Sequence, residues 1–377
     1  MSALITYLTT IRFGEGCVGE IAEDLAQLGI ERALVVTDTG VTAAGLTETV
    51  MAAAGEGRIA AVFDETPSNP TEGAAEAALA LYRASGADGL IAVGGGSPID
   101  LAKAVALMAT HEGPLESYAA ILGGIPKITA AVAPVVAVPT TAGTGSEVGR
   151  AALVTLKDGR KLGFISPHLF PRRAVCDPEL TYGMPATLTA ATGMDAISHC
   201  IETYLSPRFN PPADAIALDG LARAVRFLRR AVADGGDVEA RREMMIAALH
   251  GGLTFQKGLG AIHAISHPLG GLKAVSLHHG TLNAVLLPHV LRFNAPAAEE
   301  KYAVMRRTIG VAEDTDLAAW FDSLNGEIGM PKTLSQMGFE RQLIAPIVAG
   351  ALEDHSGPTN PRPLDEAAVT ALMEAAL

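Results

Sequence analysis

The chain has 377 residues, of which 49% are hydrophobic, and its formal net charge is −13. This length favours two domains, and the composition is that of a globular enzyme. The acidic balance argues against nucleic acid or an anionic membrane as a partner, because both are bound through clustered lysine and arginine. We therefore expect the partner to be a small molecule.

The cysteines and the first residues predict a cytoplasmic protein. Cys17, Cys176 and Cys200 are far apart in the chain and form no paired framework, so we expect no disulfides. The start, MSALITYLTTIRFGEG, lacks the basic segment and long apolar run of a signal peptide. No later stretch reaches the roughly 18 uncharged apolar residues that suggest a membrane helix. We expect neither export nor membrane insertion.

The first half of the chain predicts a parallel sheet wound with helices. Short apolar runs alternate with helical patterns, as in ALVVTD before GVTAAGLTETVMAAAG and GLIAVGGG before SPIDLAKAVALMA. We expect a further buried strand at 135–141, and an edge strand within 5–13. The run AALVTL at 151–156, followed by Asp158-Gly159, predicts a β-hairpin.

The second half predicts helices. After Gly183, Pro185 precedes long stretches rich in Ala and Leu with helical spacing, and few strand candidates remain. We therefore expect an α/β dinucleotide-binding domain over residues 1–183 and a helical domain over residues 184–377.

A glycine-rich turn predicts a phosphate site. Gly94, Gly95 and Gly96 end a predicted strand, Ser97 is expected to be the N-cap of the next helix, and Pro98 its first residue. Three glycines let the backbone approach a ligand closely, and the free N–H groups at a helix start favour a diphosphate. The alternative is a strand-to-helix turn with no ligand.

Two further features favour a dinucleotide. The loop 139–147, PTTAGTGSE, follows a strand and concentrates hydroxyls that suit ribose, amide and phosphate contacts, although a turn rich in caps is the alternative. Asp38 ends the strand ALVVTD, where a carboxylate can bind adenosine ribose hydroxyls and repel a 2′-phosphate. We therefore favour NAD over NADP. The alternative role of Asp38 is to cap the following helix.

The segment Gly14–Gly19 matches the GxGxxG dinucleotide pattern but carries Glu15, which would repel phosphate. The pattern also lies before the strand that carries Asp38. We interpret it as a tight turn.

Histidine spacing predicts a metal centre. Asp195 and His199 are four residues apart, so on a helix they share one face. Two later segments supply further imidazoles, at His263, His267, His278, His279 and His289. One carboxylate with three imidazoles suits Fe²⁺ or Zn²⁺. Spacing alone does not choose among the later histidines, and the alternative is that they are hydrogen-bonded core residues.

With these motifs, the chain resembles the iron-containing, group III alcohol dehydrogenases, which are relatives of glycerol dehydrogenase and dehydroquinate synthase. The resemblance covers nearly the whole length. It rests on the motifs TYLTTIRFGEG, VVTD, GGGSPIDLAKAVAL, VPTTAGTGSEV, CDPELTYGMPATLTAATGMDAISHCIETYLS, HAISHPLGG, HHGTLNAVLLPHVLRFN and TNPRPLD.

The resemblance implies a fold and a set of site residues. It implies a Rossmann-like α/β nucleotide-binding domain followed by an all-α domain that binds metal and substrate. The implied metal ligands are Asp195, His199, His263 and His279, with Fe²⁺ as the ion and Zn²⁺ as the alternative. The segment before Gly280 departs from the usual form, which leaves His278 as an alternative fourth ligand. The resemblance also implies that His267 is a catalytic residue that lies next to the nicotinamide and is not a metal ligand. The implied NAD-binding residues are Asp38, Gly95, Gly96, Ser97, Thr140, Thr141, Thr144, Lys161 and Leu180.

The expected activity is NAD-linked hydride transfer between a small primary alcohol and its aldehyde, with the metal polarising the substrate oxygen. The resemblance also implies a homodimer or larger homo-oligomer. Alternatives of the same fold are polyol oxidation as in glycerol dehydrogenase and metal-free reduction as in maleylacetate reductase. An alternative of another class is a lyase resembling dehydroquinate synthase, which would need several Lys and Arg around a phosphorylated substrate.

Overall fold

The structure, a computed structural model, describes residues 4–55, 57–272, 275 and 277–377. The chain divides into two compact units. The first, the α/β unit, comprises Tyr7–Thr141 and Gly145–Gly183, and the second, the helical unit, comprises Met184–Leu377 with two short segments from the first half. These segments are the residues up to Thr6 and Ala142–Thr144, which differs from the expected division.

Local contacts explain why these two segments belong to the helical unit. The backbone N–H of Thr6 donates to the Gln256 side chain at 3.1 Å. Gly143 packs so closely on Thr192 that a Cβ atom at Gly143 would lie 2.6 Å from Thr192 Cβ.

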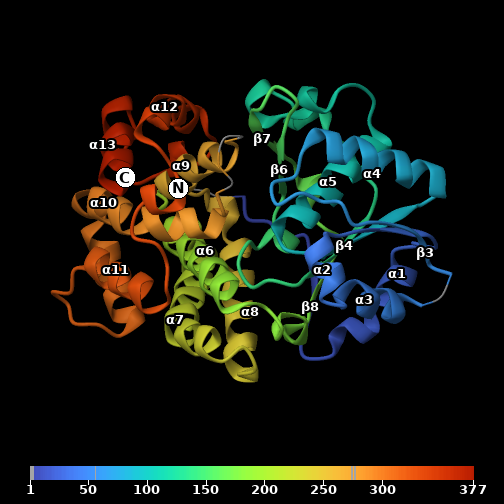
Figure 1. The fold of residues 1–377 in the computed structure, drawn as a ribbon, viewed down its shortest axis with the longest axis horizontal. Coiled ribbons are helices and arrows are strands. Elements are labelled where there is room, and N and C mark those ends of the chain that lie inside the picture. The colour runs from blue at the N-terminus through green and yellow to red at the C-terminus, as the bar shows by residue number, and fades with distance from the viewer. Residues whose placement is uncertain (1–3, 56, 273–274, 276) are drawn as a thin grey trace. The chain divides into compact units, whose positions relative to one another are not determined.

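The α/β unit is built on a six-stranded parallel sheet, and Figure 1 shows helices on both faces of it. The strand order is β1-β8-β5-β4-β2-β3. The strands are β1 (Thr10–Phe13), β2 (Ala33–Val36), β3 (Ile59–Phe63), β4 (Gly89–Gly94), β5 (Val135–Pro139) and β8 (Arg173–Cys176). The predicted α/β fold class is confirmed.

Alternate side chains of the central strands pack into two separate hydrophobic cores, as expected for a sheet covered on both faces. Leu34 and Leu90 lie in the core under α4 (Glu72–Ser85) and α5 (Gly96–Thr110). Val35 and Ile91 lie in the core on the opposite face, with side chains from α1 (Ile21–Gln27) and α3 (Leu46–Ala54). The short helix α2 (Thr39–Ala43) follows β2.

This unit also contains the predicted hairpin and the predicted edge strand. The hairpin is confirmed, because β6 (Ala151–Thr155) and β7 (Lys161–Ile165) pair antiparallel. The edge strand exists as β1 beside β8, but it covers only residues 10–13 of the predicted 5–13, since only these residues find a register on β8.

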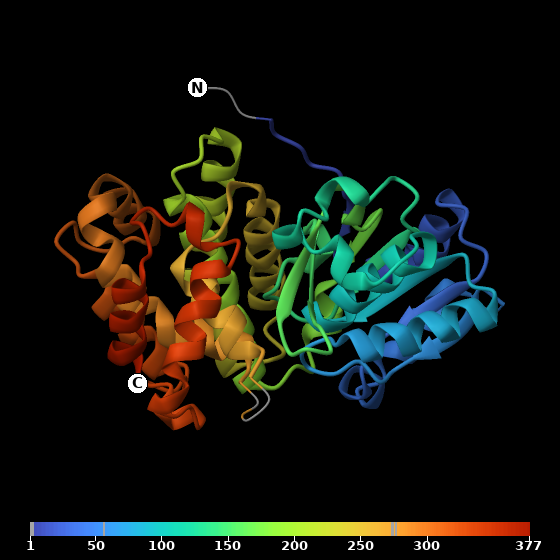
Figure 2. The same ribbon diagram turned by 90° about the horizontal axis from the view of Figure 1, so that it is seen from above.

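The helical unit places helix α6 (Ala186–Leu205) against three neighbours, and Figure 2 shows its helices together. Helices α7 (Pro211–Ala233), α8 (Val238–Leu253) and α10 (His279–Ile309) pack on α6, so from Thr189 to Leu205 every α6 side chain is buried. The remaining helices are α9 (Ala261–Gly270), α11 (Leu317–Glu327), α12 (Ile344–Glu353) and α13 (Glu366–Ala376).

Short 3-10 helices occupy many connections, at Cys17–Glu20, Leu115–Tyr118, Ala120–Leu122, Ile125–Lys127, Ser146–Val148, Pro167–Leu169, Pro178–Thr181, Phe255–Lys257, Ser335–Met337, Arg341–Leu343 and Gly357–Thr359. The three cysteines are free thiols, and all are buried: Cys17, Cys176 and Cys200. Among the residues that the structure describes, no helix is long and apolar enough to cross a bilayer.

Candidate metal centre and dinucleotide site

The helical unit brings four predicted ligands together around one carboxylate oxygen. Asp195 Oδ1 lies 3.4 Å from His199 Nε2 on the same helix, 3.6 Å from His263 Nε2 on α9 and 3.7 Å from His279 Nε2 at the first residue of α10. Asp195, His199 and His263 are almost completely buried, and His279 is partly exposed. Three helices therefore direct three imidazole nitrogens at one oxygen.

This spacing fits a bound metal ion. Ligand atoms that lie about 2.1 Å from a tetrahedrally bound ion are themselves about 3.4 Å apart, close to the separations seen here. The His199 and His263 rings lie nearly parallel with centroids 4.6 Å apart, so both can turn Nε2 to a common point. One hard oxygen with three imidazoles is a donor set for Fe²⁺ or Zn²⁺. The residues present therefore fit a divalent transition metal.

Electrostatics favour the metal-binding protonation state at two of the four residues, Asp195 and His199. Burial acts to raise the pKa of Asp195, but the surrounding His199, His279 and His263 imidazoles outweigh it and hold the pKa well below the ordinary value. Burial, partly offset by Asp195, lowers the pKa of His199 to about 4. An ionised carboxylate and a neutral imidazole are the forms that bind metal.

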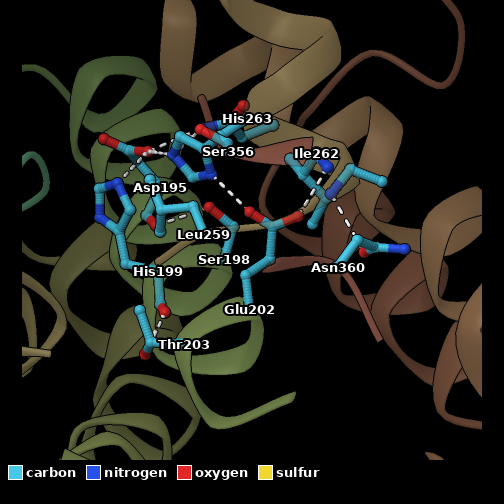
Figure 3. Close-up of polar contacts among 12 residues, drawn as sticks. Asp195, Ser198, His199, Glu202, Thr203, Leu259, Ile262, His263, Ser356 and Asn360 are labelled. Carbon is cyan, nitrogen blue, oxygen red and sulfur yellow. Dashed lines mark hydrogen bonds and ion pairs between the residues drawn. The ribbon is translucent and has the colours of Figure 1, made fainter. Parts of the chain in front are cut away.

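His263 is held by a second carboxylate that the sequence reasoning missed. Glu202 Oε2 accepts a hydrogen bond from His263 Nδ1 at 2.7 Å, and Glu202 Oε1 accepts one from the Ile262 backbone N–H at 2.6 Å (Figure 3). Burial acts to lower the pKa of His263, but its contacts with Asp195 and Glu202 outweigh this and raise the pKa to about 9. Glu202 thereby directs Nε2 of His263 toward the cluster.

A local signal for Glu202 was present in the sequence. It lies three residues after His199 and seven after Asp195, so all three occupy one face of α6. What the spacing did not reveal is that this face meets the start of α9.

Asn283 is a further buried neighbour that was missed. Its Nδ2 donates to Asp195 Oδ1 at 2.7 Å and lies 3.2 Å from both His263 Nε2 and His279 Nε2. It stands four residues after His279 on α10, so the same turn of helix carries both side chains. Asn283 therefore contacts three of the four candidate ligands.

The two adjacent histidines before Gly280 occupy different environments. His279 points its Nε2 at Asp195, whereas His278 is the N-cap of α10, and its Nδ1 accepts from the Thr281 backbone N–H at 3.4 Å. The structure also leaves His289 outside the cluster, beside Arg292 and Asp322. The geometry thus groups His279, not His278, with the other three candidate ligands.

His267 stands beside the metal cluster but faces another partner. Its Nδ1 lies 2.8 Å from Asp354 Oδ2, and its ring stacks on that of His279 with centroids 5.7 Å apart. His267 as a whole residue is 4% exposed, so its ring is buried inside the helical unit. His267 can therefore act next to a bound ion without being one of the four grouped ligands.

In the α/β unit, the predicted dinucleotide residues lie at a change in strand order. Ignoring β1, the strands run 2-1-3-4-5 in sequence order, so the order reverses between β2 and β4. Asp38 follows the end of β2, and Gly95 and Gly96 follow the end of β4. Ligands of such sheets bind outside the carboxyl ends of the strands at this switch point. The topology therefore brings the carboxylate and the glycine turn to one place.

Two details of this region differ from, or extend, the sequence expectation. Helix α5 starts at Gly96 with Gly95 as its N-cap, so Ser97 is not the cap; its hydroxyl instead donates to the Ser68 carbonyl at 2.5 Å. Glycine backbone here permits an earlier helix start than a serine cap would. Asp38 is the N-cap of α2, accepting from the Val41 N–H at 2.9 Å, which was the alternative reading.

The other predicted cofactor residues have varied surroundings. Thr140 is buried, and Thr141 places its buried Oγ1 close to Gly95, with no hydrogen-bond partner in the described parts of the chain. Thr144 belongs to the helical unit. Lys161 donates to Asn69 Oδ1 at 2.9 Å, while Leu180 is packed in a core of the α/β unit. The unpartnered Thr141 hydroxyl beside the glycine turn fits a site that a polar ligand completes.

The GxGxxG match at Gly14–Gly19 is a structural turn, as interpreted from the sequence. The backbone N–H groups of Gly16 and Val18 donate to the two carboxylate oxygens of Asp177 at 3.1 and 3.0 Å. The anion that this turn binds is thus a side chain of the same unit.

A candidate dinucleotide site in the α/β unit and a candidate metal site of one carboxylate and three imidazoles in the helical unit are features of a metal-dependent, NAD-linked dehydrogenase. The chain belongs to the iron-containing alcohol dehydrogenase family, whose description matches residues 9–178, with the C-terminal part of the same family matching residues 189–377.

Known proteins similar to this chain are alcohol and aldehyde oxidoreductases. A 4-hydroxybutyrate dehydrogenase of Cupriavidus necator is 53% identical over 99% of both chains. The crystal structure of a 1,3-propanediol oxidoreductase is 36% identical, covers all of both chains and has a TM-score of 0.93. A sulfoacetaldehyde reductase of Bifidobacterium kashiwanohense, in complex with NAD⁺, is 29% identical over 100% of this chain and 99% of its own, with a TM-score of 0.89. The chain is accordingly an oxidoreductase that acts on the CH–OH group of small alcohols.

Proposed function

We propose that this chain interconverts a primary hydroxy acid of the 4-hydroxybutyrate type and the corresponding aldehyde acid, using NAD. Two of the similar proteins carry names of substrates that bear an anionic group at the end opposite to the reacting carbon. The greater similarity is to the 4-hydroxybutyrate enzyme, which aligns over almost all of both chains. The observation that supports dehydrogenation itself is the largely buried cluster of Asp195, His199, His263 and His279.

The proposal assigns these four residues to one Fe²⁺ ion, with Zn²⁺ as the alternative. When bound, the ion supplies Lewis acidity to the substrate oxygen, and the nicotinamide accepts the hydride. The protein's part is to present one ionised carboxylate and three imidazoles, which bind the ion in their neutral form. Glu202 and Asn283 hold His263 and Asp195 in place for this purpose.

For the cofactor, the proposal assigns the diphosphate to the backbone of Gly95 and Gly96 and the nicotinamide side to Thr140, Thr141 and Thr144. Asp38 uses one oxygen as a helix cap, and its second oxygen accepts from the adenosine ribose. Ser97, Lys161 and Leu180 are assigned to the surroundings of the cofactor.

His267 is assigned the proton of the substrate hydroxyl. It is buried beside His279, and its Nδ1 is occupied by Asp354, which leaves Nε2 for this transfer. We further propose that the chain forms a homodimer or a larger homo-oligomer, which light scattering of the purified protein measures.

The substrate proposal is tested with a matched panel of 4-hydroxybutyrate, 1,4-butanediol and 1-butanol. These molecules share a four-carbon chain and a primary hydroxyl, and they differ at the far end. We expect kcat/KM with NAD⁺ to be highest for 4-hydroxybutyrate, and activity with NADP⁺ to be lower because Asp38 repels a 2′-phosphate. Equal or higher kcat/KM for the two uncharged alcohols would exclude the hydroxy acid as the preferred substrate.

The alternatives from the sequence have separate signatures in the same assay. Oxidation of glycerol in preference to all three compounds would favour the polyol enzyme. Full activity after chelation would favour metal-free reduction. A lyase of the dehydroquinate synthase type would produce no net NADH.

A further inference from the structure

The histidine proposed to take the substrate proton has a carboxylate partner from a distant part of the sequence. Asp354 directly follows helix α12, which packs beside the α9 helix that carries His267. The two helices approach closely at Gly350, where a Cβ atom would lie 2.8 Å from Pro268 Cβ. Asp354 is thereby brought to a residue 87 positions earlier in the chain.

The contact between the two side chains is short, buried and supported from both sides. Asp354 Oδ2 lies 2.8 Å from His267 Nδ1, and the side chains are 10% and 5% exposed. The other oxygen of Asp354 accepts the Ser356 backbone N–H at 2.8 Å, which fixes the carboxylate. The ring of His267 is held by near-parallel stacking on both His279 and His355.

The protonation states of this pair follow from hydrogen-bond chemistry. Burial acts to raise the pKa of Asp354, but its contacts with His267, His355 and the Ser356 N–H outweigh burial and hold the pKa below its ordinary value. An ionised carboxylate can only accept hydrogen bonds, so Nδ1 of His267 must carry the hydrogen. In the neutral imidazole, Nε2 then carries a lone pair and can accept a proton.

We propose that Asp354 is a positioning residue for catalysis, which fixes His267 as the tautomer that has Nε2 free to accept the substrate proton. The inference rests on the proposed role of His267. In alcohol oxidation the hydroxyl O–H bond breaks and its proton moves to Nε2, while the hydride leaves the same carbon for NAD⁺. The imidazolium keeps its Nδ1–H bond to Asp354 and later releases the Nε2 proton to solvent. Asp354 remains ionised throughout.

The kinetic test uses Asp354→Asn, which preserves size but allows the amide to donate to Nδ1 and so permits the opposite tautomer. We expect kcat to fall by at least about tenfold, the scale of loss when a partner that orients a histidine is removed. KM for NAD⁺ and the bound metal content should stay at wild-type values. Glu353→Gln, which removes the same charge from the exposed neighbouring residue, should keep the wild-type kcat.

A double substitution separates action through His267 from a general structural effect. If Asp354 acts through His267, Asp354→Asn should change the residual rate of His267→Gln by no more than about twofold, because the two losses are coupled. Losses that multiply instead would overturn the proposal, as would a wild-type kcat for Asp354→Asn.

A direct measurement does not depend on activity. In protein labelled with ¹⁵N-histidine, the His267 resonances, identified by their loss in His267→Gln, should show hydrogen on Nδ1 in the wild type and a mixture of tautomers in Asp354→Asn. Hydrogen on Nε2 in the wild type would overturn the proposal. If the tautomer is as expected but no alcohol is oxidised, the proposed function fails while the Asp354–His267 pairing stands.

Discussion

His263 uses its two ring nitrogens for different purposes. Nδ1 donates to Glu202, and Nε2 lies 3.6 Å from Asp195 Oδ1 in the candidate metal centre. A metal-binding histidine commonly has such a carboxylate partner, because it fixes the tautomer and makes the binding nitrogen more basic. The strength of the proposed metal site therefore depends on Glu202, a residue that touches no ion itself.

Substituting Glu202→Gln should weaken metal binding without removing a ligand. The amide has no charge and can also present N–H groups to His263, so we expect the metal dissociation constant to rise by about 10- to 100-fold. Competition with a chromogenic chelator measures this constant. Glu239→Gln is the control, because Glu239 is an exposed ion-pair partner of Arg230 and should leave the constant unchanged. An unchanged constant in Glu202→Gln would contradict this role.

At this scale the sequence predicted what spacing along one helix can predict. Asp195 and His199 are four residues apart, and on one helix that spacing alone places them together. Asp354 lies 87 residues from His267, and no local pattern links two such positions. The choice between His278 and His279 also depends on packing, because it is decided by which side chain caps α10.

At the scale of elements, the candidate metal centre depends on a close contact between the first turn of α10 and helix α6. Gly280, the residue after His279, packs on the backbone of Ala191, and a Cβ atom there would lie 2.3 Å from the Ala191 carbonyl oxygen. Moving the backbone atoms of a buried, closely packed helix costs free energy. Only glycine lets the first turn of α10 place His279 at this distance.

Gly280→Ala should therefore displace the start of α10 and reduce metal content together with stability. We expect a loss of about 1–3 kcal/mol in the free energy of unfolding, as for other overpacked sites. Urea unfolding and metal analysis measure the two effects. Gly326→Ala on α11 is the matched control, since its Cβ would meet nothing within 4 Å and should not lower either quantity. A fully metal-loaded Gly280→Ala protein of wild-type stability would contradict this account.

The end of α6 is held by a lysine whose protonation should be visible in stability. Lys301 on α10 donates to the carbonyls of Tyr204, Leu205 and Ser206, at 2.7, 3.3 and 2.9 Å. Burial, followed by the charge of Lys257, lowers the pKa of Lys301 to about 8, from an ordinary value of 10.5. Between these values the unfolded chain binds the proton more strongly than the folded protein, so stability gains as pH rises.

We therefore expect the free energy of unfolding of the wild type, minus that of Lys301→Met, to increase from pH 7.5 to pH 9.5. Urea unfolding at both values gives this difference, and the exposed Lys332→Met serves as the control with a difference that is flat in pH. If the difference between the wild type and Lys301→Met stays constant or decreases with pH, the pKa of Lys301 is not lowered in the folded protein.

Element boundaries were harder to predict than the elements. The strands, the hairpin and the helical second half were predicted from apolar periodicity, but α5 begins before Ser97 because glycines can cap it. Asp38 likewise caps α2. A side chain that caps a helix and one that binds a ribose follow the same local pattern, so the sequence could not separate these roles.

At the scale of the whole molecule, each unit contributes one half of the proposed chemistry. The sheet of the α/β unit places Asp38 and the glycine turn at its switch point, and the helical unit gathers the four candidate ligands. The order of motifs along the chain predicted an α/β domain followed by a helical domain, and the structure confirms this fold class. The preferred alcohol was not predictable, because specificity depends on side chains that packing brings near the reacting carbon from separate helices.

The central claim is that the four-residue cluster binds the ion on which turnover depends. The most direct measurement is an anaerobic titration of chelator-stripped protein with Fe²⁺, and separately with Zn²⁺, in which bound metal and NADH production from 4-hydroxybutyrate are recorded together. We predict that activity rises in proportion to bound metal and reaches its plateau at one ion per chain, and that His263→Ala abolishes both. Full NADH production by the stripped protein, or metal binding that His263→Ala leaves unchanged, would contradict the account.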